Sequence, residues 1–226
     1  MHIDEAITTR RSVRAFKPDP VSRATIEHIL AVASRAPSGS NTQPWKVYVV
    51  AGEAKARLSQ AILKARREDP PGTHRAEYRY YLKNWREPYL ARRRATGWGL
   101  YNLIGIKRGD IEAGKRQLER NFVFFDAPVG LIVTLERDME QGSWIDLGGF
   151  IQNVLLAARG QNLHSCAQAA FMDYHAVIRR ELGVPEAEIV VCGISIGIED
   201  AGKPENRLRT PREPVSRFAA FFDLPG

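Results

Sequence analysis

Cysteine is scarce in this chain of 226 residues, which contains only Cys166 and Cys192. Both lie in apolar surroundings without the spacing of metal ligands, a pattern that favours buried, reduced thiols over a disulfide framework or a zinc site. Long apolar runs are absent as well, and the first residues, MHIDEAITTRR, lack the apolar centre of a secretory signal. We therefore expect a cytoplasmic protein with no bound metal and no membrane partner.

The two commonest nucleotide-binding motifs are also missing. No GxGxxG follows a predicted strand, and no GxxxxGK[ST] occurs. Neither a Rossmann site nor a P-loop is supported, so any nucleotide-like ligand must be held in another way.

Acidic residues are fewer than basic ones, 26 against 33, and the formal net charge is +7. The excess is concentrated between His74 and Arg94, where seven basic and two acidic residues are interleaved with tyrosines and a tryptophan. Such a mixture suits nucleic acid, an anionic planar small molecule, or a solvated helix face covered by arginine stems. Composition alone does not separate these three interpretations.

Apolar residues make up 44% of the chain, enough for a substantial core in one domain or two small ones. The periodicity predicts a helix capped by Ser22 and ending near Pro37, and further helices over residues 54–67, 145–159 and 173–182, with an interrupted helical region over 77–122. Strands are predicted over 46–50, 129–135 and 190–198. Helices outnumber strands without regular alternation, which indicates the α+β class.

Two basic clusters lie near opposite ends of the sequence. The first, RRSVRAF, surrounds Ser12 with Arg10, Arg11 and Arg14, a set of donors that suits a phosphate. The second cluster comprises Arg207, Arg209 and Arg212. It lies in the segment 203–214, whose proline and arginine content predicts an extended arm. If folding or dimerisation brings the clusters together, their combined charge would favour a phosphate.

A third motif, PSGSNTQPW, covers residues 37–45 between a predicted helix and a predicted strand. Taken in order with the basic clusters and the apolar GSWIDLGGFIQNVLLAARGQNL helix, it resembles the FMN-dependent nitroreductase family. The similarity runs from about Arg10 to Arg212, nearly the whole chain. It implies one domain over residues 1–226, an α+β sandwich with a central, mostly antiparallel sheet flanked by helices. It also implies an intertwined homodimer with two FMN sites at the subunit interface and an arm, residues 203–226, on the partner.

The resemblance assigns the cofactor-binding residues position by position. Arg10 and Ser12 would hold the FMN phosphate, with Arg11 contributing from the same turn, and Arg207 and Arg209 would join them, with Arg212 as a third. Arg14 would face the pyrimidine edge of the flavin, where a fixed guanidinium stabilises the negative charge of the reduced ring. From the other subunit, Asn41 is the expected main polar contact within a set that packs along the isoalloxazine: Pro37, Ser38, Gly39, Ser40 and Asn41.

One stretch departs from the family pattern. Many members have a Pro-x-x-Gly or Pro-x-Glu-Gly turn facing flavin N5, whereas this chain has AQAAF at 167–171, after a predicted strand. A backbone N–H needs no particular side chain, so Ala169 or Ala170 can still donate to N5, and Gln168 can add an amide contact. The alternative is an ordinary strand-to-helix turn.

The implied reaction is a ping-pong transfer in which NAD(P)H reduces FMN at N5 and the flavin then reduces a nitroaromatic or quinone-like acceptor, without an obligatory catalytic side chain. Basic charge favours NADPH over NADH. Residues 70–106 are expected to form a helical lid. Candidate substrate contacts are aromatic, although helix packing is an alternative role for each of them: Tyr81, Trp85, Tyr89, Trp98 and Tyr101.

Two other functions stay open at this point. The same scaffold can support dehalogenation or flavin destruction, which differ from nitroreduction in their products. A basic nucleic-acid-binding protein is the alternative from another class, and it would be colourless and bind DNA or RNA with steep salt dependence.

Overall fold

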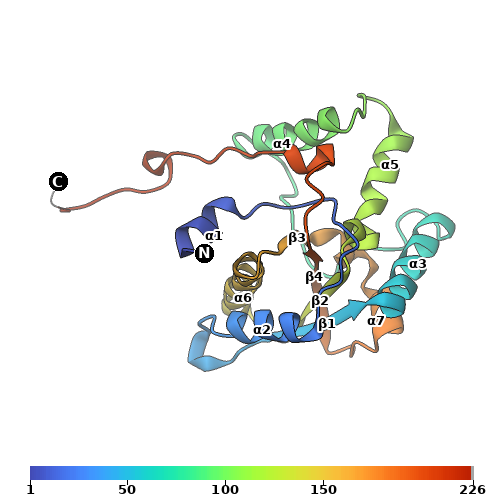
Figure 1. The fold of residues 1–226 in the computed structure, drawn as a ribbon, viewed down its shortest axis with the longest axis horizontal. Coiled ribbons are helices and arrows are strands. Elements are labelled where there is room, and N and C mark those ends of the chain that lie inside the picture. The colour runs from blue at the N-terminus through green and yellow to red at the C-terminus, as the bar shows by residue number, and fades with distance from the viewer. Residues whose placement is uncertain (225–226) are drawn as a thin grey trace.

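The computed structural model of the chain describes residues 1–224. Its centre is a four-stranded sheet in the order β1-β2-β4-β3, in which every neighbouring pair is antiparallel. The strands are β1 (Trp45–Ala51), β2 (Val129–Glu136), β3 (His164–Gln168) and β4 (Glu188–Gly197). Helices cover both faces of this sheet (Figure 1), so the predicted α+β sandwich is confirmed.

Strand β2 shows why the central strands are apolar throughout. Successive side chains of a strand point to opposite faces. Leu131 and Val133 join a core with α2 (Arg23–Ala33) and α6 (Gln141–Gly160), while Ile132 joins a second core with α3 (Gly52–Glu68) and α7 (His175–Leu182). Because both faces are buried, the strand is a continuous apolar run rather than an alternating one.

Most predicted elements are present with small shifts of their ends. Ser22 caps α2, since its Oγ accepts a hydrogen bond from the N–H of Thr25 at 3.1 Å, but the helix ends at Ala33 rather than near Pro37. The predicted strands at 46–50, 129–135 and 190–198 correspond to β1, β2 and β4, and the helices at 54–67 and 145–159 correspond to α3 and α6.

The prediction of an interrupted helical region over 77–122 is wrong for residues 77–88, which contain no helix. Helices follow only as α4 (Tyr89–Leu103), α5 (Ile111–Glu119) and the 3-10 segment η2 (Arg120–Asp126). Tertiary contacts hold residues 77–88 in an irregular course: Tyr78 donates to the carbonyl of Val191 at 2.6 Å, and Glu77 pairs with Arg179 at 2.8 Å. Pro88 also disfavours helix at the residue before it.

The prediction that Asp173 caps a helix is also wrong. Asp173 lies inside the 3-10 segment η3 (Ala169–Tyr174), and α7 begins at His175 without a side-chain cap. The Asp173 carboxylate instead accepts a hydrogen bond from the N–H of Ala76 at 3.1 Å, so it fixes a distant loop. Strand β3 runs through Gln168, so the first two residues of AQAAF belong to the strand.

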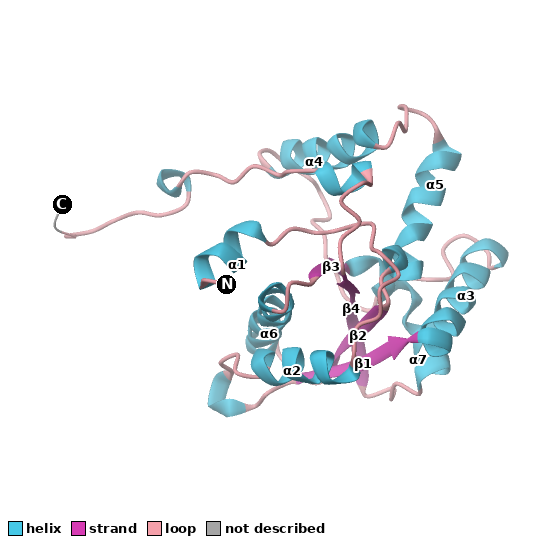
Figure 2. Ribbon diagram, viewed as in Figure 1, coloured by secondary structure: helices cyan, strands magenta, loops and turns pink. Residues whose placement is uncertain are grey.

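The two ends of the chain lie away from the sheet (Figure 2). The first element is α1 (Ile3–Thr9), and the last are the short 3-10 turns η4 (Pro204–Arg207) and η5 (Val215–Arg217). Between these turns the chain extends away from the body, and Phe218, Phe221 and Phe222 expose 66–82% of their surface. Within the described residues, no helix is both long and apolar enough to cross a membrane.

Candidate functional site

A hollow of about 750 Å³ brings the two basic clusters together. Its lining includes six of the residues singled out from the sequence: Arg10, Arg11, Ser12, Arg14, Arg209 and Arg212. We call this space the basic hollow. Arg207 lies on η4 with an exposed side chain and is not part of the lining. Folding of a single chain is therefore sufficient to join the N-terminal cluster to two arginines of the C-terminal one.

The side chain of Asn206 holds these two segments together. Its Oδ1 accepts a hydrogen bond from the backbone N–H of Arg14 at 2.7 Å. Its Nδ2 donates to the carbonyls of Ala15 at 2.8 Å and Asp200 at 2.9 Å, and the residue is buried. The sequence analysis missed Asn206, because its partners lie far away in the chain and no local pattern marks it.

The arginines of the basic hollow differ in how far their charge is neutralised. Arg11 pairs with the buried carboxylate of Glu199, which also lies 3.4 Å from Nε2 of His164. Burial, and then Arg159, lower the pKa of His164, so this histidine adds little positive charge at neutral pH. Within residues 1–224, by contrast, no carboxylate pairs with three other arginines of the hollow: Arg10, Arg209 and Arg212. These three retain the charge that an anionic group would meet.

A smaller hollow of about 350 Å³ adjoins the basic hollow through Arg14, which lines both. We call it the inner hollow. Three predicted residues of the AQAAF stretch, Gln168, Ala169 and Ala170, form part of its wall together with Tyr81. Arg14 is oriented locally, since its Nη1 donates to the carbonyl of Ser12 at 3.2 Å. The inner hollow thus has a positive charge where it meets the basic hollow.

Both polar atoms of the Gln168 side chain make hydrogen bonds within the protein. Its Nε2 donates to the carbonyl of Asn121 at 2.9 Å, and its Oε1 accepts from the hydroxyl of Ser195. Unlike the side chain of Gln168, the backbone N–H groups of Ala169 and Ala170 are not used by a side-chain cap, because η3 begins at these residues without one. The first N–H groups of a helical segment have no acceptor within it, so these two can serve a ligand. Asn121 also lines the hollow, and the sequence analysis missed it.

The segment 37–41 lies outside both hollows. Ser40 and Asn41 adopt left-handed backbone angles, φ 50° and 59°, which cost energy for residues other than glycine. The loop is nevertheless well fixed, because the N–H of Gly39 donates to Asp146 at 3.1 Å and the N–H of Gln43 donates to Ser38 Oγ at 3.0 Å. It thus presents a rigid, mostly exposed polar surface away from the hollows of its own chain.

Trp45 is the last residue of the PSGSNTQPW motif and the first residue of β1, and it anchors this strand to α6. Its ring stacks on Phe150 with centroids 4.8 Å apart and an interplanar angle of 7°. Trp45 therefore has a packing role.

The five predicted substrate-contacting aromatics are placed differently from one another. Tyr81 lines the inner hollow. Trp85 lies under the guanidinium of Arg93 at 4.6 Å, and the ring of Tyr89 has Arg86 and Arg92 within 5.8 Å. The remaining two, Trp98 and Tyr101, pack edge to face on α4 with centroids 6.1 Å apart. The structure brings only Tyr81 of this set to the inner hollow.

Within residues 1–224, no group of three or more His, Cys, Asp or Glu side chains is arranged to hold an ion. Cys166 and Cys192 are both buried free thiols, and burial raises the pKa of Cys192 to about 12. The candidate site is thus built from arginines, hydroxyl groups and backbone N–H groups.

Several known proteins that are similar to this chain over most of its length are nitroreductases. The model of the nitroreductase family matches residues 7–198. The nitrobenzene nitroreductase of Ectopseudomonas oleovorans is 42% identical over 219 residues, which cover 97% of this chain and 96% of that protein. The 4-nitrobenzoate reductase of Nocardioides sp. is 42% identical over 222 residues, which cover 97% of this chain and 89% of that one.

Two solved structures have the same fold. The FMN and NADPH-dependent nitroreductase NfnB from Sphigopyxis sp. strain HMH has a TM-score of 0.95 at 35% identity, covering 99% of this chain and 100% of that one. The FMN-dependent nitroreductase NfnB from Mycobacterium smegmatis, solved in complex with NADPH, has a TM-score of 0.91 at 32% identity and covers 97% of each chain.

Proposed function

The chain belongs to the nitroreductase family, and from this premise we propose that it is an FMN-dependent oxidoreductase that uses NAD(P)H to reduce nitroaromatic compounds. The observation that supports this most directly is the junction of the two hollows at Arg14. A basic space and a space with free backbone donors lie side by side, in the order in which FMN presents its phosphate and its ring.

The residues present fit FMN by their chemistry. A phosphate in the basic hollow would meet both charged and neutral hydrogen-bond donors. The charged donors are Arg10, Arg209 and Arg212, and the neutral donor is the hydroxyl of Ser12. A phosphate contact from Arg207 or Arg11 stays a prediction. Arg207 lies outside the basic hollow, and Arg11 pairs with Glu199. When bound, FMN supplies the redox chemistry, accepting a hydride from NAD(P)H and passing electrons to the acceptor.

The protein's own contribution is orientation and electrostatics. Arg14 presents a fixed positive charge where the pyrimidine edge would lie, and this charge stabilises a ring that has gained electrons. The N–H of Ala169 or Ala170 would face N5 and orient the ring edge. In this proposal no side chain acts as an obligatory acid or base, and Tyr81 contributes an aromatic wall for the acceptor.

We further propose that the active form is a homodimer. Residues 37–41 are rigid and exposed yet lie away from the hollows of their own chain, which suits a contribution to the partner's flavin. The exposed phenylalanines of the arm 203–226 would be covered by the partner. Residues 70–106 would form the lid of a single domain covering residues 1–226. A quinone-like acceptor stays an alternative substrate.

NADPH is our preferred donor, because both NfnB structures are described with NADPH and this chain is basic. We place the protein in the cytoplasm and expect a small aromatic acceptor, with neither nucleic acid nor membrane as a partner. Dehalogenation or flavin destruction would use the same cofactor site and is distinguished by its products.

The test is a visible spectrum followed by a turnover experiment. Purified protein should be yellow, should bleach anaerobically with NADPH, and should recover its colour when nitrobenzene is added, with the reduced nitrogen product detected by chromatography. A colourless protein that cannot be reconstituted with FMN would overturn the proposal. Salt-sensitive binding of DNA by such a colourless protein would favour the nucleic-acid alternative instead.

A further inference from the structure

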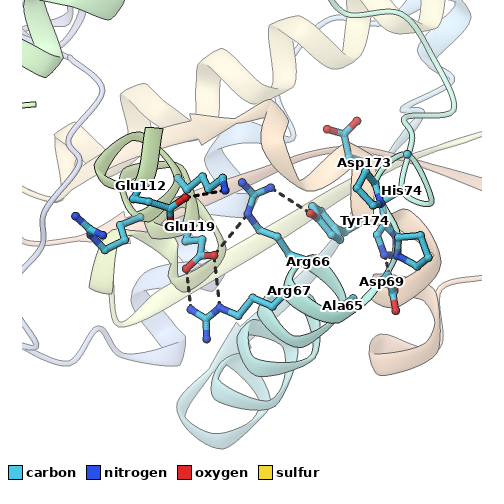
Figure 3. Close-up of a pocket in the computed structure, with 14 residues that line it drawn as sticks. Ala65, Arg66, Arg67, Asp69, His74, Glu112, Glu119, Asp173 and Tyr174 are labelled. Carbon is cyan, nitrogen blue, oxygen red and sulfur yellow. Dashed lines mark hydrogen bonds and ion pairs between the residues drawn. The ribbon is translucent and has the colours of Figure 1, made fainter. Parts of the chain in front are cut away.

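A larger hollow of about 870 Å³ adjoins the inner hollow, and Figure 3 shows the residues that line this larger hollow. It lies between the end of α3, helix α5 and residues 69–74, and we call it the outer hollow. Arg66 and Asp173 line both the inner and the outer hollow. A ligand that extends outward from the inner hollow therefore meets Arg66 at the boundary between them.

The inner hollow next to Arg66 has aromatic and apolar walls. Phe122, Phe125 and Tyr81 line it together with Met172. Phe122 is fixed by its neighbours, since it packs edge to face on Tyr174 with centroids 4.8 Å apart. Walls of this kind suit a flat aromatic ring, and Arg66 lies where this hollow opens into the outer one.

Three contacts fix the guanidinium of Arg66. Its Nη1 donates to the hydroxyl of Tyr174 at 3.3 Å, its Nε lies 3.7 Å from Glu119 Oε1, and its Cζ lies 5.8 Å from the centroid of the Phe122 ring. Figure 3 shows Arg66 between Glu119 and Tyr174. Because the side chain is only 22% exposed and already oriented, binding an anion would order little that is not ordered already.

The charge of Arg66 is only partly neutralised by its acidic neighbours. The carboxylate of Glu119 is closer to Arg67, at 2.7 Å, than to Arg66, at 3.7 Å. The second acid on this wall, Asp173, accepts a hydrogen bond from the N–H of Ala76 at 3.1 Å. Both acids compete with an incoming anion. Glu119 is the acid within ion-pair distance of Arg66, and because it pairs more closely with Arg67, Arg66 is still able to pair with a carboxylate.

We propose that Arg66 binds the carboxylate of an aromatic acceptor whose ring lies beside the flavin, at the boundary between the inner and outer hollows, so that the enzyme prefers nitroarenes with an anionic substituent to neutral ones. This inference rests on the proposed function. The preference comes from a guanidinium that is planar, permanently charged and held in place, properties that match a carboxylate and give no advantage to an ester.

The experiment compares 4-nitrobenzoate with methyl 4-nitrobenzoate in the FMN-loaded enzyme with NADPH. The measured quantity is the ratio of the two kcat/KM values. In Arg66→Gln this ratio should fall about 10- to 100-fold, the effect expected for losing a hydrogen bond to a charged group, and Arg66→Lys should give an intermediate ratio. FMN absorbance of each variant verifies that the cofactor site is intact.

Lys115→Gln is the matched control, because it removes the same charge from the outer hollow without touching the inner one. Lys115 is 58% exposed and pairs with Glu112 at 2.8 Å. The ratio should change less than about 2-fold in this variant, as is usual for exposed ion pairs. Glu119→Gln should change the ratio in the opposite direction, upward, because it removes a competing carboxylate. This variant tests the inference even if Arg66→Gln fails to fold.

Three results would overturn the inference. The ratio could remain at the wild-type value in Arg66→Gln and Glu119→Gln, or it could fall as much in Lys115→Gln as in Arg66→Gln. A rise in KM for NADPH with an unchanged ratio would assign Arg66 to the coenzyme instead. If the wild-type protein reduces neither compound, the proposed function itself is wrong. If the wild type reduces both compounds and the Arg66 variants keep the same ratio, only the inference about Arg66 is wrong.

Discussion

The side-chain oxygen of Asn206 accepts a hydrogen bond from the backbone N–H of Arg14 at 2.7 Å, across a separation of 192 residues. The amide nitrogen of the same side chain donates to the carbonyls of Ala15 and Asp200. A single buried amide therefore connects the segment that carries the N-terminal arginines to the segment that leads to Arg209. Together with the hydrogen bond from the N–H of Asp200 to the carbonyl of Ala15 at 3.1 Å, this connection joins the two sides of the basic hollow inside one chain.

Replacing Asn206 with Ala should weaken both stability and FMN binding. The substitution leaves the N–H of Arg14 without its partner and removes one of the two hydrogen bonds to the carbonyl of Ala15, so we expect a loss of about 2–4 kcal/mol in the free energy of unfolding. FMN content should fall as well, because fewer hydrogen bonds hold the two basic segments together. Urea denaturation at fixed protein and FMN concentrations checks the first effect, and absorbance of the purified protein checks the second.

The exposed Asn84 provides the matched control for that substitution. Asn84→Ala should change the free energy of unfolding by less than about 0.5 kcal/mol and leave FMN content unchanged. Asn206→Ala with wild-type stability and full FMN content would mean that the connection has no functional consequence.

A mixed dimer tests whether two chains share each flavin site. Arg10→Ala removes a charge from the basic hollow, and Asn41→Gly removes a side chain while tolerating the φ of 59° at that position. Each variant alone should bind FMN about 10-fold more weakly, as expected for a lost polar contact. A heterodimer of the two should regain one intact site, and therefore about half of the wild-type FMN content and activity.

The two tagged chains are co-expressed, and the heterodimer is purified through both tags in turn. If Arg10 and Asn41 served the same site within one chain, both sites of the heterodimer would be defective and activity would stay low. Wild-type chains carrying the same two tags provide the reference for a fully active dimer.

The parts of the site that could be predicted are those with a local pattern. Arg10, Ser12 and Arg14 lie within five residues, and their side-chain types alone indicate an anion site. Asn206 and Asn121 could not be found in this way, because each acts through a partner in a distant segment. A lone asparagine carries no signal of such a partner, so only the folded chain reveals it.

The same reasoning explains the errors in secondary structure. Periodicity predicts elements that bury one face, and it succeeds for α2, α3 and α6. It fails over 77–88, where Glu77 and Tyr78 reach Arg179 and Val191 through side-chain contacts that no repeat in the segment encodes. Asp173 is a residue type that commonly caps helices, yet its carboxylate accepts a hydrogen bond from the N–H of Ala76 instead. Tertiary contacts override local preference in each case.

Gly193 should be intolerant of a side chain because of its position beside Phe171. A methyl group on Gly193 would overlap the buried Phe171 ring, which packs against Phe124 with centroids 4.6 Å apart. Phe171 follows Ala169 and Ala170 in η3, so any shift of its ring also moves the backbone donors of the inner hollow. Gly193→Ala should therefore lower the free energy of unfolding by about 1–3 kcal/mol and reduce kcat with nitrobenzene.

Gly160→Ala is the control for that substitution, since a methyl group there meets no atom within 4 Å. We expect this variant to keep wild-type stability within about 1 kcal/mol, because alanine favours helix over glycine. Equal behaviour of the two variants in thermal or urea unfolding would contradict the steric argument.

Glu188 is a buried carboxylate whose hydrogen bonds make the fold sensitive to acid. It accepts from the hydroxyl of Thr134 at 2.5 Å and from that of Tyr48 at 2.9 Å, and Lys46 lies 3.3 Å away. Burial raises the pKa of Glu188, but these three partners outweigh it and hold the pKa below its ordinary value of 4.5. Its ionised form is therefore stabilised by folding.

The stability that Glu188 supplies is present above pH 4.5 and is lost as the pH falls through its lower folded-state pKa, because the unfolded chain takes up this proton first. In that acidic window the free energy of unfolding should fall by up to about 1.4 kcal/mol per pH unit on account of this one proton. Glu188→Gln should be less stable than the wild type at pH 7 but should show a shallower decline in the same window. Urea unfolding between pH 3 and 7, at one protein concentration with excess FMN, measures both slopes. Parallel slopes for the two proteins would show that another carboxylate governs acid sensitivity.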